Sequence, residues 1–155
     1  MKVLRIFISP SHNYFGHHGM APGEQPMVEV SAVECLAGRG LAGDRFLDHK
    51  PDYKGQVTFF EQEVFEDLRD SFAVFDRDVD AFRRNVVVSG QDLRALIGRE
   101  FTLQGVRFSG SEEAKPCYWM DEAFCPGAEA ALKGRGGLRA RILSDGVLRV
   151  DAPEG

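Results

Sequence analysis

The stretch Phe101-Thr102-Leu103-Gln104-Gly105-Val106-Arg107-Phe108 has the pattern of two short β-strands joined by a tight turn. Apolar and polar side chains alternate in each half, which places every second residue on the same face of a strand. Gln104-Gly105 lies between the halves, and glycine readily adopts the positive φ that tight hairpin turns require. The stretch therefore predicts a β-hairpin, and similar patterns elsewhere predict a mainly β protein.

Further strands and a few helices are predicted on both sides of this hairpin. Apolar runs flank Ser144-Asp145-Gly146, and Asp-Gly between such runs predicts a second hairpin. The strands predicted outside the first hairpin cover residues 4–8, 28–32, 56–60, 84–89, 138–143 and 147–150, and the predicted helices cover residues 61–72, 92–97 and 121–133. Many short strands with few inserted helices favour a closed or partly closed β-barrel.

Length, charge and cysteine content exclude several classes of protein. The 155 residues suit a single domain, residues 1–155, with an ordinary hydrophobic core. A formal net charge of −5 argues against a general nucleic-acid or anionic-membrane surface. No apolar run approaches the roughly 20 residues that span a bilayer. Three cysteines without a CxxC pair, and no recognisable export signal, predict reduced thiols and a cytoplasmic location.

Cys117, in Lys115-Pro116-Cys117, is the main candidate for chemistry. A thiolate is the side chain best suited to bind a soft metal or to carry a sulfur atom. The charge of Lys115 favours the thiolate, and Pro116 restricts the backbone just before it. The alternative is a small buried hydrophobic residue, which we expect for Cys35 and Cys125. Cys125 is also considered as a second, resolving thiol.

Two basic segments lie on either side of Cys117 in the sequence. In Gly134-Arg135-Gly136-Gly137-Leu138-Arg139, the glycine N–H groups and Arg135 suit an anion, and a surface turn is the alternative. In Arg83-Arg84-Asn85, alternation along the predicted strand directs Arg83 and Asn85 to one side and leaves Arg84 in solvent. Arg83 would then grip a phosphate and the Asn85 amide would bind a heterocycle edge, with ordinary surface charge as the alternative.

Two long connections, residues 9–26 and 36–55, are predicted to lie at a functional rim. The second contains Gly40-Leu41-Ala42-Gly43-Asp44-Arg45, which either contacts a ligand or is braced by an Asp44–Arg45 ion pair. The histidines lack a recognised zinc spacing, so a zinc site is not expected. His17 and His18, in the first connection, are candidates for proton transfer.

Taken together, these segments resemble the MOSC domain, which is named for the C-terminal domain of molybdenum-cofactor sulfurases. The resemblance extends over nearly all of residues 28–150, and its parts occur in the order that is typical of the family. The matching segments are Gly40-Leu41-Ala42-Gly43-Asp44-Arg45, Arg83-Arg84-Asn85-Val86-Val87, Gly90, Asp92, Leu93, Leu96-Ile97-Gly98, Pro116-Cys117 and Arg135-Gly136-Gly137-Leu138-Arg139-Ala140.

The resemblance implies a β-barrel-like fold and a cysteine that ligates molybdenum or carries persulfide sulfur; Cys117 matches that position. Regions matched by Arg83, Asn85 and Arg135 hold the pterin and its phosphate in the family. His17 and Asp44 are candidate proton donors, and the family as a whole is also associated with pyridoxal phosphate. The expected cofactor-binding residues are Arg83, Asn85, Lys115, Arg135, Gly136, Gly137 and Arg139, of which Lys115 and Arg139 are chosen from charge and proximity alone.

The function implied is that of a molybdopterin-binding protein that reduces small N-hydroxylated or N-oxygenated substrates, or that handles or sulfurates the cofactor. No cysteine set suits an iron–sulfur cluster, so an external protein would donate electrons or exchange cofactor. A non-enzymatic carrier of persulfide or cofactor is one alternative. A barrel that binds another small anionic ligand, with Cys117 buried, is a second. Neither nucleic acid nor membrane is expected as a partner.

Overall fold

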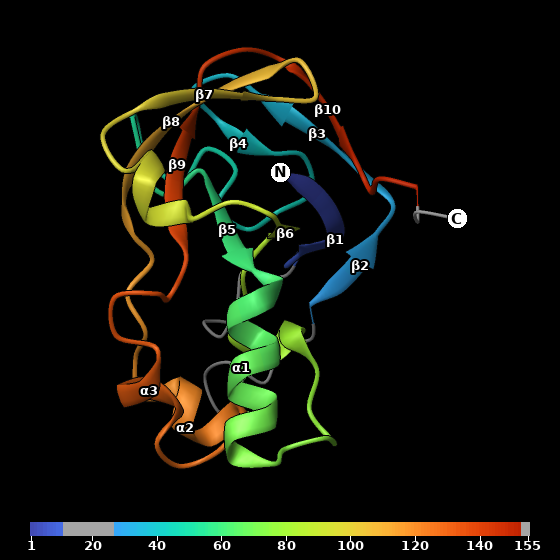
Figure 1. Ribbon diagram of the computed structural model, residues 1–155. Helices are drawn as coiled ribbons and strands as arrows, with labels where there is room; N and C mark the ends of the chain where they lie inside the picture. Colours follow the sequence, from blue (N-terminus) through green and yellow to red (C-terminus); the bar gives the residue numbers. More distant parts are fainter. Residues whose placement is uncertain (11–26, 153–155) are drawn as a thin grey trace, which may run out of the picture.

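The computed structural model describes residues 1–10 and 27–152, which form two β-sheets with the α-helices gathered at one end (Figure 1). The larger sheet has seven strands in the order β2-β1-β6-β5-β9-β8-β7. Only β5 and β6 pair in parallel; the other neighbours are antiparallel. The strands are β1 (Lys2–Ile8), β2 (Val28–Val30), β5 (Val57–Glu61), β6 (Val86–Ser89), β7 (Glu100–Leu103), β8 (Val106–Glu113) and β9 (Leu138–Ile142).

The predicted hairpin around Gln104-Gly105 is confirmed. β7 and β8 pair in antiparallel register from Glu100 opposite Ser109 to Leu103 opposite Val106. Both turn residues have positive φ, 52° at Gln104 and 81° at Gly105. Such a pair of values suits the right-handed twist of the flanking strands.

The smaller sheet has three strands in the order β10-β3-β4, formed by β3 (Ala32–Leu36), β4 (Gly40–Leu41) and β10 (Gly146–Arg149). The predicted hairpin around Asp145-Gly146 is therefore wrong, because β9 pairs with β5 and β8 whereas β10 pairs with β3. The Asp145 carboxylate accepts a hydrogen bond from the Ala37 N–H at 2.8 Å. This contact ties the turn to the end of β3, so the chain crosses from one sheet to the other.

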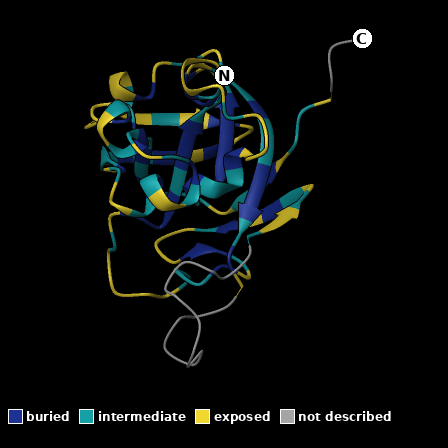
Figure 2. Cartoon of the chain, turned by 90° about the horizontal axis from the view of Figure 1, so that it is seen from below, coloured by how far each residue is buried: buried dark blue, intermediate teal, exposed yellow. Residues whose placement is uncertain are grey.

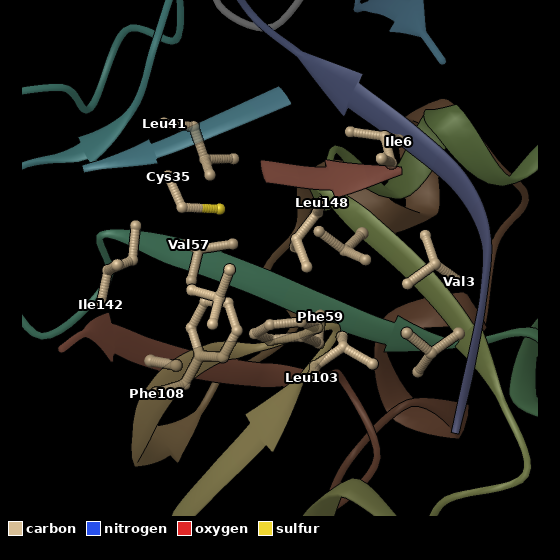
Figure 3. Packing of buried hydrophobic residues seen from close by; sticks show 14 of the residues in the cluster. Val3, Ile6, Cys35, Leu41, Val57, Phe59, Leu103, Phe108, Ile142 and Leu148 are labelled. Atoms are coloured by element: carbon tan, nitrogen blue, oxygen red, sulfur yellow. The ribbon is translucent and has the colours of Figure 1, made fainter. Parts of the chain in front are cut away.

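Neither sheet closes on itself, so a mainly β fold is confirmed but the predicted β-barrel is not. The main core instead contains side chains from both sheets (Figure 3). Val57, Phe59 and Phe108 from the larger sheet lie in one cluster with Cys35 and Leu148 from the smaller one, and all five are fully buried. Figure 2 shows the buried residues mainly along the strands and the exposed ones on the connecting loops.

A second core contains buried side chains from the helices between residues 62 and 82 and between residues 119 and 131, whereas the helical turn at Leu93 packs in the main core. The predicted helix over residues 61–72 is confirmed as α1 (Gln62–Phe72), and the turn predicted over 92–97 is the 3-10 helix η3 (Leu93–Leu96). The helix predicted over 121–133 is split into α2 (Trp119–Ala123) and α3 (Ala128–Ala131), because Gly127 between them has a φ of 95°. A further 3-10 helix, η2 (Val79–Phe82), precedes β6. In the described part of the chain, no helix is long and apolar enough to cross a membrane.

Candidate functional site

A cavity of about 250 Å³ lies where three connections meet: the β4–β5 loop, the segment before β6 and the segment that leads from β8 to α2. Ser9 and Met27, on either side of the undescribed residues 11–26, also line it. The lining residues are Ser9, Met27, Asp44, Arg45, Phe46, Tyr53, Gly55, Thr58, Phe82, Arg83, Arg84, Asn85, Ala114, Lys115, Cys117, Tyr118, Trp119, Met120 and Arg139. The cavity therefore contains Cys117, Asp44, Arg83, Asn85, Lys115 and Arg139 from the predicted set.

The Cys117 side chain is exposed and lines the cavity. The alternative of a buried structural residue therefore does not describe it. Cys35 is that residue: it is fully buried in the main core, and burial raises the pKa of its thiol to about 12. Cys125 is half-buried against the second core, where burial, followed by the charge of Asp121, raises the pKa of its thiol. Of the three cysteines, Cys117 is the most exposed.

Five basic side chains line the cavity, and Asp44 is the single carboxylate among the described lining residues; the basic ones are Arg45, Arg83, Arg84, Lys115 and Arg139. The Arg45 guanidinium lies 4.8 Å from the centre of the Phe46 ring. Arg139 donates a hydrogen bond to Glu112 at 3.3 Å, and both side chains are more than one-third exposed, so this pair is weak. The protein as a whole is acidic, and the cavity is a local basic site suited to an anion.

Arg84 differs most from its prediction. Its guanidinium donates hydrogen bonds to the backbone carbonyls of Phe82, Ala114 and Gly136 at 2.9–3.1 Å, so the prediction that it lies in solvent is wrong. Burial lowers the pKa of Arg84 to about 10, an effect opposed by the charge of nearby Cys117. At neutral pH it remains a cation. The alternation argument fails because β6 begins at Val86, beyond Arg84.

Arg83 precedes the strand as well and has a left-handed backbone conformation, with φ 60° and ψ 39°, at the end of η2. Such a conformation is uncommon for a residue with a long side chain; here it ends η2, and the Arg83 N–H donates to the Asp80 carbonyl at 3.0 Å. It places Arg83 on the cavity wall beside Arg84.

Asn85 and Asp44 form a buried polar network in the wall of the cavity. The Asn85 Oδ1 accepts hydrogen bonds from the N–H and hydroxyl of Thr58, both at 3.0 Å, and its Nδ2 donates to the Phe7 carbonyl at 3.1 Å. The Asp44 carboxylate accepts bonds from the N–H groups of Ser9 and Phe46 and from Asn85 Nδ2. These contacts hold β1, β5 and the β4–β5 loop together, and the bracing is by backbone N–H groups rather than by an Asp44–Arg45 ion pair.

Arg135, Gly136 and Gly137 do not line the cavity. Arg135 pairs with Asp67 on α1 at 2.7 Å and donates to the Ala131 carbonyl. The Gly136 N–H donates to Glu113 at 3.1 Å, so it is directed at the protein itself. Both glycines pack against the chain just before Cys117. His17 and His18 lie outside the described residues. Within residues 1–10 and 27–152, no group of three or more His, Cys, Asp or Glu suitable for a metal ion occurs.

Several lining residues escaped the sequence reasoning. Phe46 and Tyr53 stack with ring centres 5.8 Å apart in the long β4–β5 loop, whose position at a rim was predicted only as a segment. Tyr118 and Trp119 follow Cys117 directly. Ser9 is 1% exposed, and its hydroxyl has no hydrogen-bond partner within residues 1–10 and 27–152. No sequence pattern marks Ser9, because only the fold brings the end of β1 to the cavity.

Comparison with solved structures shows the same fold in bacterial proteins. YuaD from Bacillus subtilis superposes with a TM-score of 0.72 at 15% identity, over 96% of this chain and 91% of that protein. YiiM from Geobacillus stearothermophilus gives a TM-score of 0.69 at 15% identity, over 98% of this chain and 72% of that one. YiiM from Escherichia coli gives 0.66 at 16% identity, over 99% and 68%.

The sequence comparisons identify the family. No curated protein sequence matches the chain. A sequence profile of the MOSC domain matches residues 47–153, well over half of the chain, and this range contains β5 to β10 and the segment that carries Cys117. The chain therefore belongs to the MOSC domain family.

Proposed function

We propose that this protein binds a molybdopterin-type molybdenum cofactor in the cavity, with the Cys117 thiolate as the protein ligand to the metal. The family is generally associated with molybdenum cofactor binding. The observation that carries the proposal is the exposed Cys117 thiol at a cavity lined by five basic side chains. A soft thiolate suits molybdenum, and a basic pocket suits the phosphate of a pterin cofactor.

The chemistry of the lining residues fits such a group. Arg45, Arg83, Lys115 and Arg139 supply positive charge, and guanidinium groups bind phosphate oxygens through paired N–H donors. The buried Ser9 hydroxyl offers a donor and acceptor that no other described residue uses, and such groups usually have a partner in the functional state. The cavity thus combines a metal ligand with anion and polar contacts.

Within this proposal, the protein reduces small N-hydroxylated or N-oxygenated substrates. The cofactor, when bound, supplies two-electron redox chemistry, and a separate protein donates the electrons. The rings of Phe46, Tyr53, Tyr118 and Trp119 would limit water around the bound substrate. A proton from His17 or Asp44 remains a prediction; the Asp44 oxygens already accept three hydrogen bonds.

A non-enzymatic carrier of persulfide or cofactor is the second candidate. Its support is the accessibility of Cys117 and Tyr118, whose side chains are both exposed, with Tyr118 at 66%. A thiol that receives or delivers sulfur must be reached by another protein, and an exposed position permits this. In this role Cys117 would gain the mass of one sulfur atom, and a reducing agent would remove it.

The test is to produce the protein in a host that makes molybdopterin and in one that cannot, and to measure molybdenum in the purified protein by mass spectrometry. The proposal predicts metal in near-stoichiometric amount only from the first host. Protein without molybdenum from both hosts would contradict it. A reducible sulfur adduct on Cys117 in metal-free protein would favour the carrier.

A further inference from the structure

We propose that Arg84 and the Gly136-Gly137 turn are positioning elements that hold Cys117 at the cavity. They grip the segment Ala114–Cys117, here called the Cys117 strap, which runs from the end of β8 to the start of α2. This positioning stands on contacts within the protein alone. Only its meaning for a molybdenum ligand rests on the proposed function.

Arg84 binds two backbone carbonyl groups of the strap. Its Nη2 donates to the carbonyl oxygens of Ala114 at 2.9 Å and Lys115 at 3.4 Å. Nε donates to the Gly136 carbonyl at 2.9 Å, and Nη1 to the Phe82 carbonyl at 3.1 Å. A guanidinium has five N–H donors in a fixed plane, so four bonds to carbonyls of its own chain leave little capacity for a ligand. Arg84 is therefore a clamp, although it lines the cavity.

The glycine turn, which Arg84 also contacts, packs directly against the strap. The Ala114 N–H donates to the Gly137 carbonyl at 2.9 Å. A Cβ atom on Gly136 would overlap the Ala114 carbonyl oxygen and lie 2.8 Å from Pro116 Cδ. A Cβ on Gly137 would overlap the Phe59 carbonyl oxygen, and Gly137 has a φ of 116°. The two glycines are thus needed for close packing of backbone against backbone, a role distinct from an anion-binding nest.

The backbone of Cys117 is consequently held at both ends while its thiol stays exposed. Pro116 restricts the chain immediately before it, and the Cys117 carbonyl accepts a hydrogen bond from the Met120 N–H at 3.0 Å. A ligand residue must be kept close to its productive geometry by the residues that surround it. Arg84 is the charged side chain that joins the strap to η2 and to the glycine turn.

The test uses cofactor-free protein, so it does not depend on the proposed function. Amide hydrogen exchange of the strap and the mobility of a nitroxide label on Cys117 are measured in a Cys125→Ser background, in which Cys35 is buried. The variants are Arg84→Gln and Arg84→Lys. Arg139→Gln is the matched control, since it removes one positive charge from the same cavity. In the wild type, Arg139 donates a hydrogen bond to Glu112 and not to the strap.

We expect Arg84→Gln to accelerate exchange in the strap about tenfold and to narrow the nitroxide lines, because two bonds that fix the strap are lost. Arg84→Lys should do the same, because an ammonium keeps the charge but not the planar fork. Arg139→Gln should change neither readout. Full rescue by Arg84→Lys, or an equal effect of Arg139→Gln, would assign Arg84 a role of charge alone.

Gly136→Ala offers a second route to the same conclusion, because its Cβ would displace the strap at Ala114 and Pro116 while the Arg84 side chain itself is kept. It should also mobilise the label on Cys117. If Arg84→Lys fails to fold, the four hydrogen bonds of Arg84 are needed for the fold as a whole. A specific role in positioning Cys117 is then overturned. Unchanged exchange in a folded Arg84→Gln protein would overturn it equally.

Discussion

Asn85→Ala separates a structural role of this amide from a role in ligand recognition. The Asn85 side chain is 6% exposed, and it bonds to the N–H and hydroxyl of Thr58 and to the Phe7 carbonyl. Its removal leaves the Thr58 N–H and the Phe7 carbonyl without these partners. Each unsatisfied buried group costs about 1–3 kcal/mol, and water from the adjacent cavity would recover part of that. We therefore expect the free energy of unfolding to fall by about 2–4 kcal/mol.

Urea denaturation of the ligand-free protein measures this loss, and a thermal scan should show the melting temperature lowered by about 6–12 °C. An unchanged m-value would show that the loss is one of stability rather than of cooperativity. Gln91→Ala is the control: among the described residues this side chain bonds only to the adjacent Asp92 carbonyl, in a solvent-exposed contact, and we expect a change within about 0.5 kcal/mol. A loss below about 0.5 kcal/mol for Asn85→Ala would show that these bonds do not stabilise the fold and would favour an amide reserved for a ligand.

Three further outcomes follow from burial. Phe59→Ala should lower the free energy of unfolding by about 3–5 kcal/mol in urea denaturation, because the ring is fully buried and packs edge-on against Phe108 at 5.3 Å; a loss near 1 kcal/mol would contradict the packing. At pH 7.5 or thereabouts, about one unit below the ordinary thiol pKa, peptide mapping after brief alkylation should find Cys117 modified and Cys35 protected, and equal labelling of both would disprove the assigned burial. Burial, followed by the charges of neighbouring acids, raises the pKa of Glu61, so the folded protein holds that proton more tightly than the unfolded chain. Ionisation of Glu61 therefore destabilises the folded protein. This destabilisation is absent below the ordinary pKa of a glutamate and complete above the raised pKa, so Glu61→Gln should be more stable than the wild type at pH 7 but not at about pH 4. Urea denaturation measures the difference in free energy of unfolding between Glu61→Gln and the wild type. An equal increase at both pH values would show that ionisation of Glu61 is not its cause.

Local signals predicted the individual strands better than their partners. The alternation around Gln104-Gly105 determines a hairpin because the turn and both strands are contiguous in the sequence. Asp145-Gly146 carries an equally strong turn signal, yet the strands on either side enter different sheets. The strand that pairs with β10 is β3, and both this pairing and the bond from Ala37 to the Asp145 carboxylate join residues far apart in the sequence. The open sheets have the same cause, since closure depends on pairing between distant strands.

The sequence predicts which residue types lie at the site, but not which of them face a ligand and which hold the protein's own backbone. Cys117, Arg83 and Lys115 were expected at the ligand, and all three line the cavity. Arg84 was expected in solvent because alternation was applied to a residue that precedes the strand. The glycines of the turn suit an anion nest and close packing equally well in sequence, and only the position of the Cys117 strap distinguishes the two.

X-ray absorption at the molybdenum edge tests the central claim, that Cys117 is the protein ligand to the metal, most directly. The measurement compares the cofactor-loaded wild type with Cys117→Ala and with the control Cys125→Ala. We expect Cys117→Ala to lose one sulfur neighbour of molybdenum, or the metal altogether, and Cys125→Ala to match the wild type. An unchanged sulfur shell and full metal content in Cys117→Ala would contradict the claim.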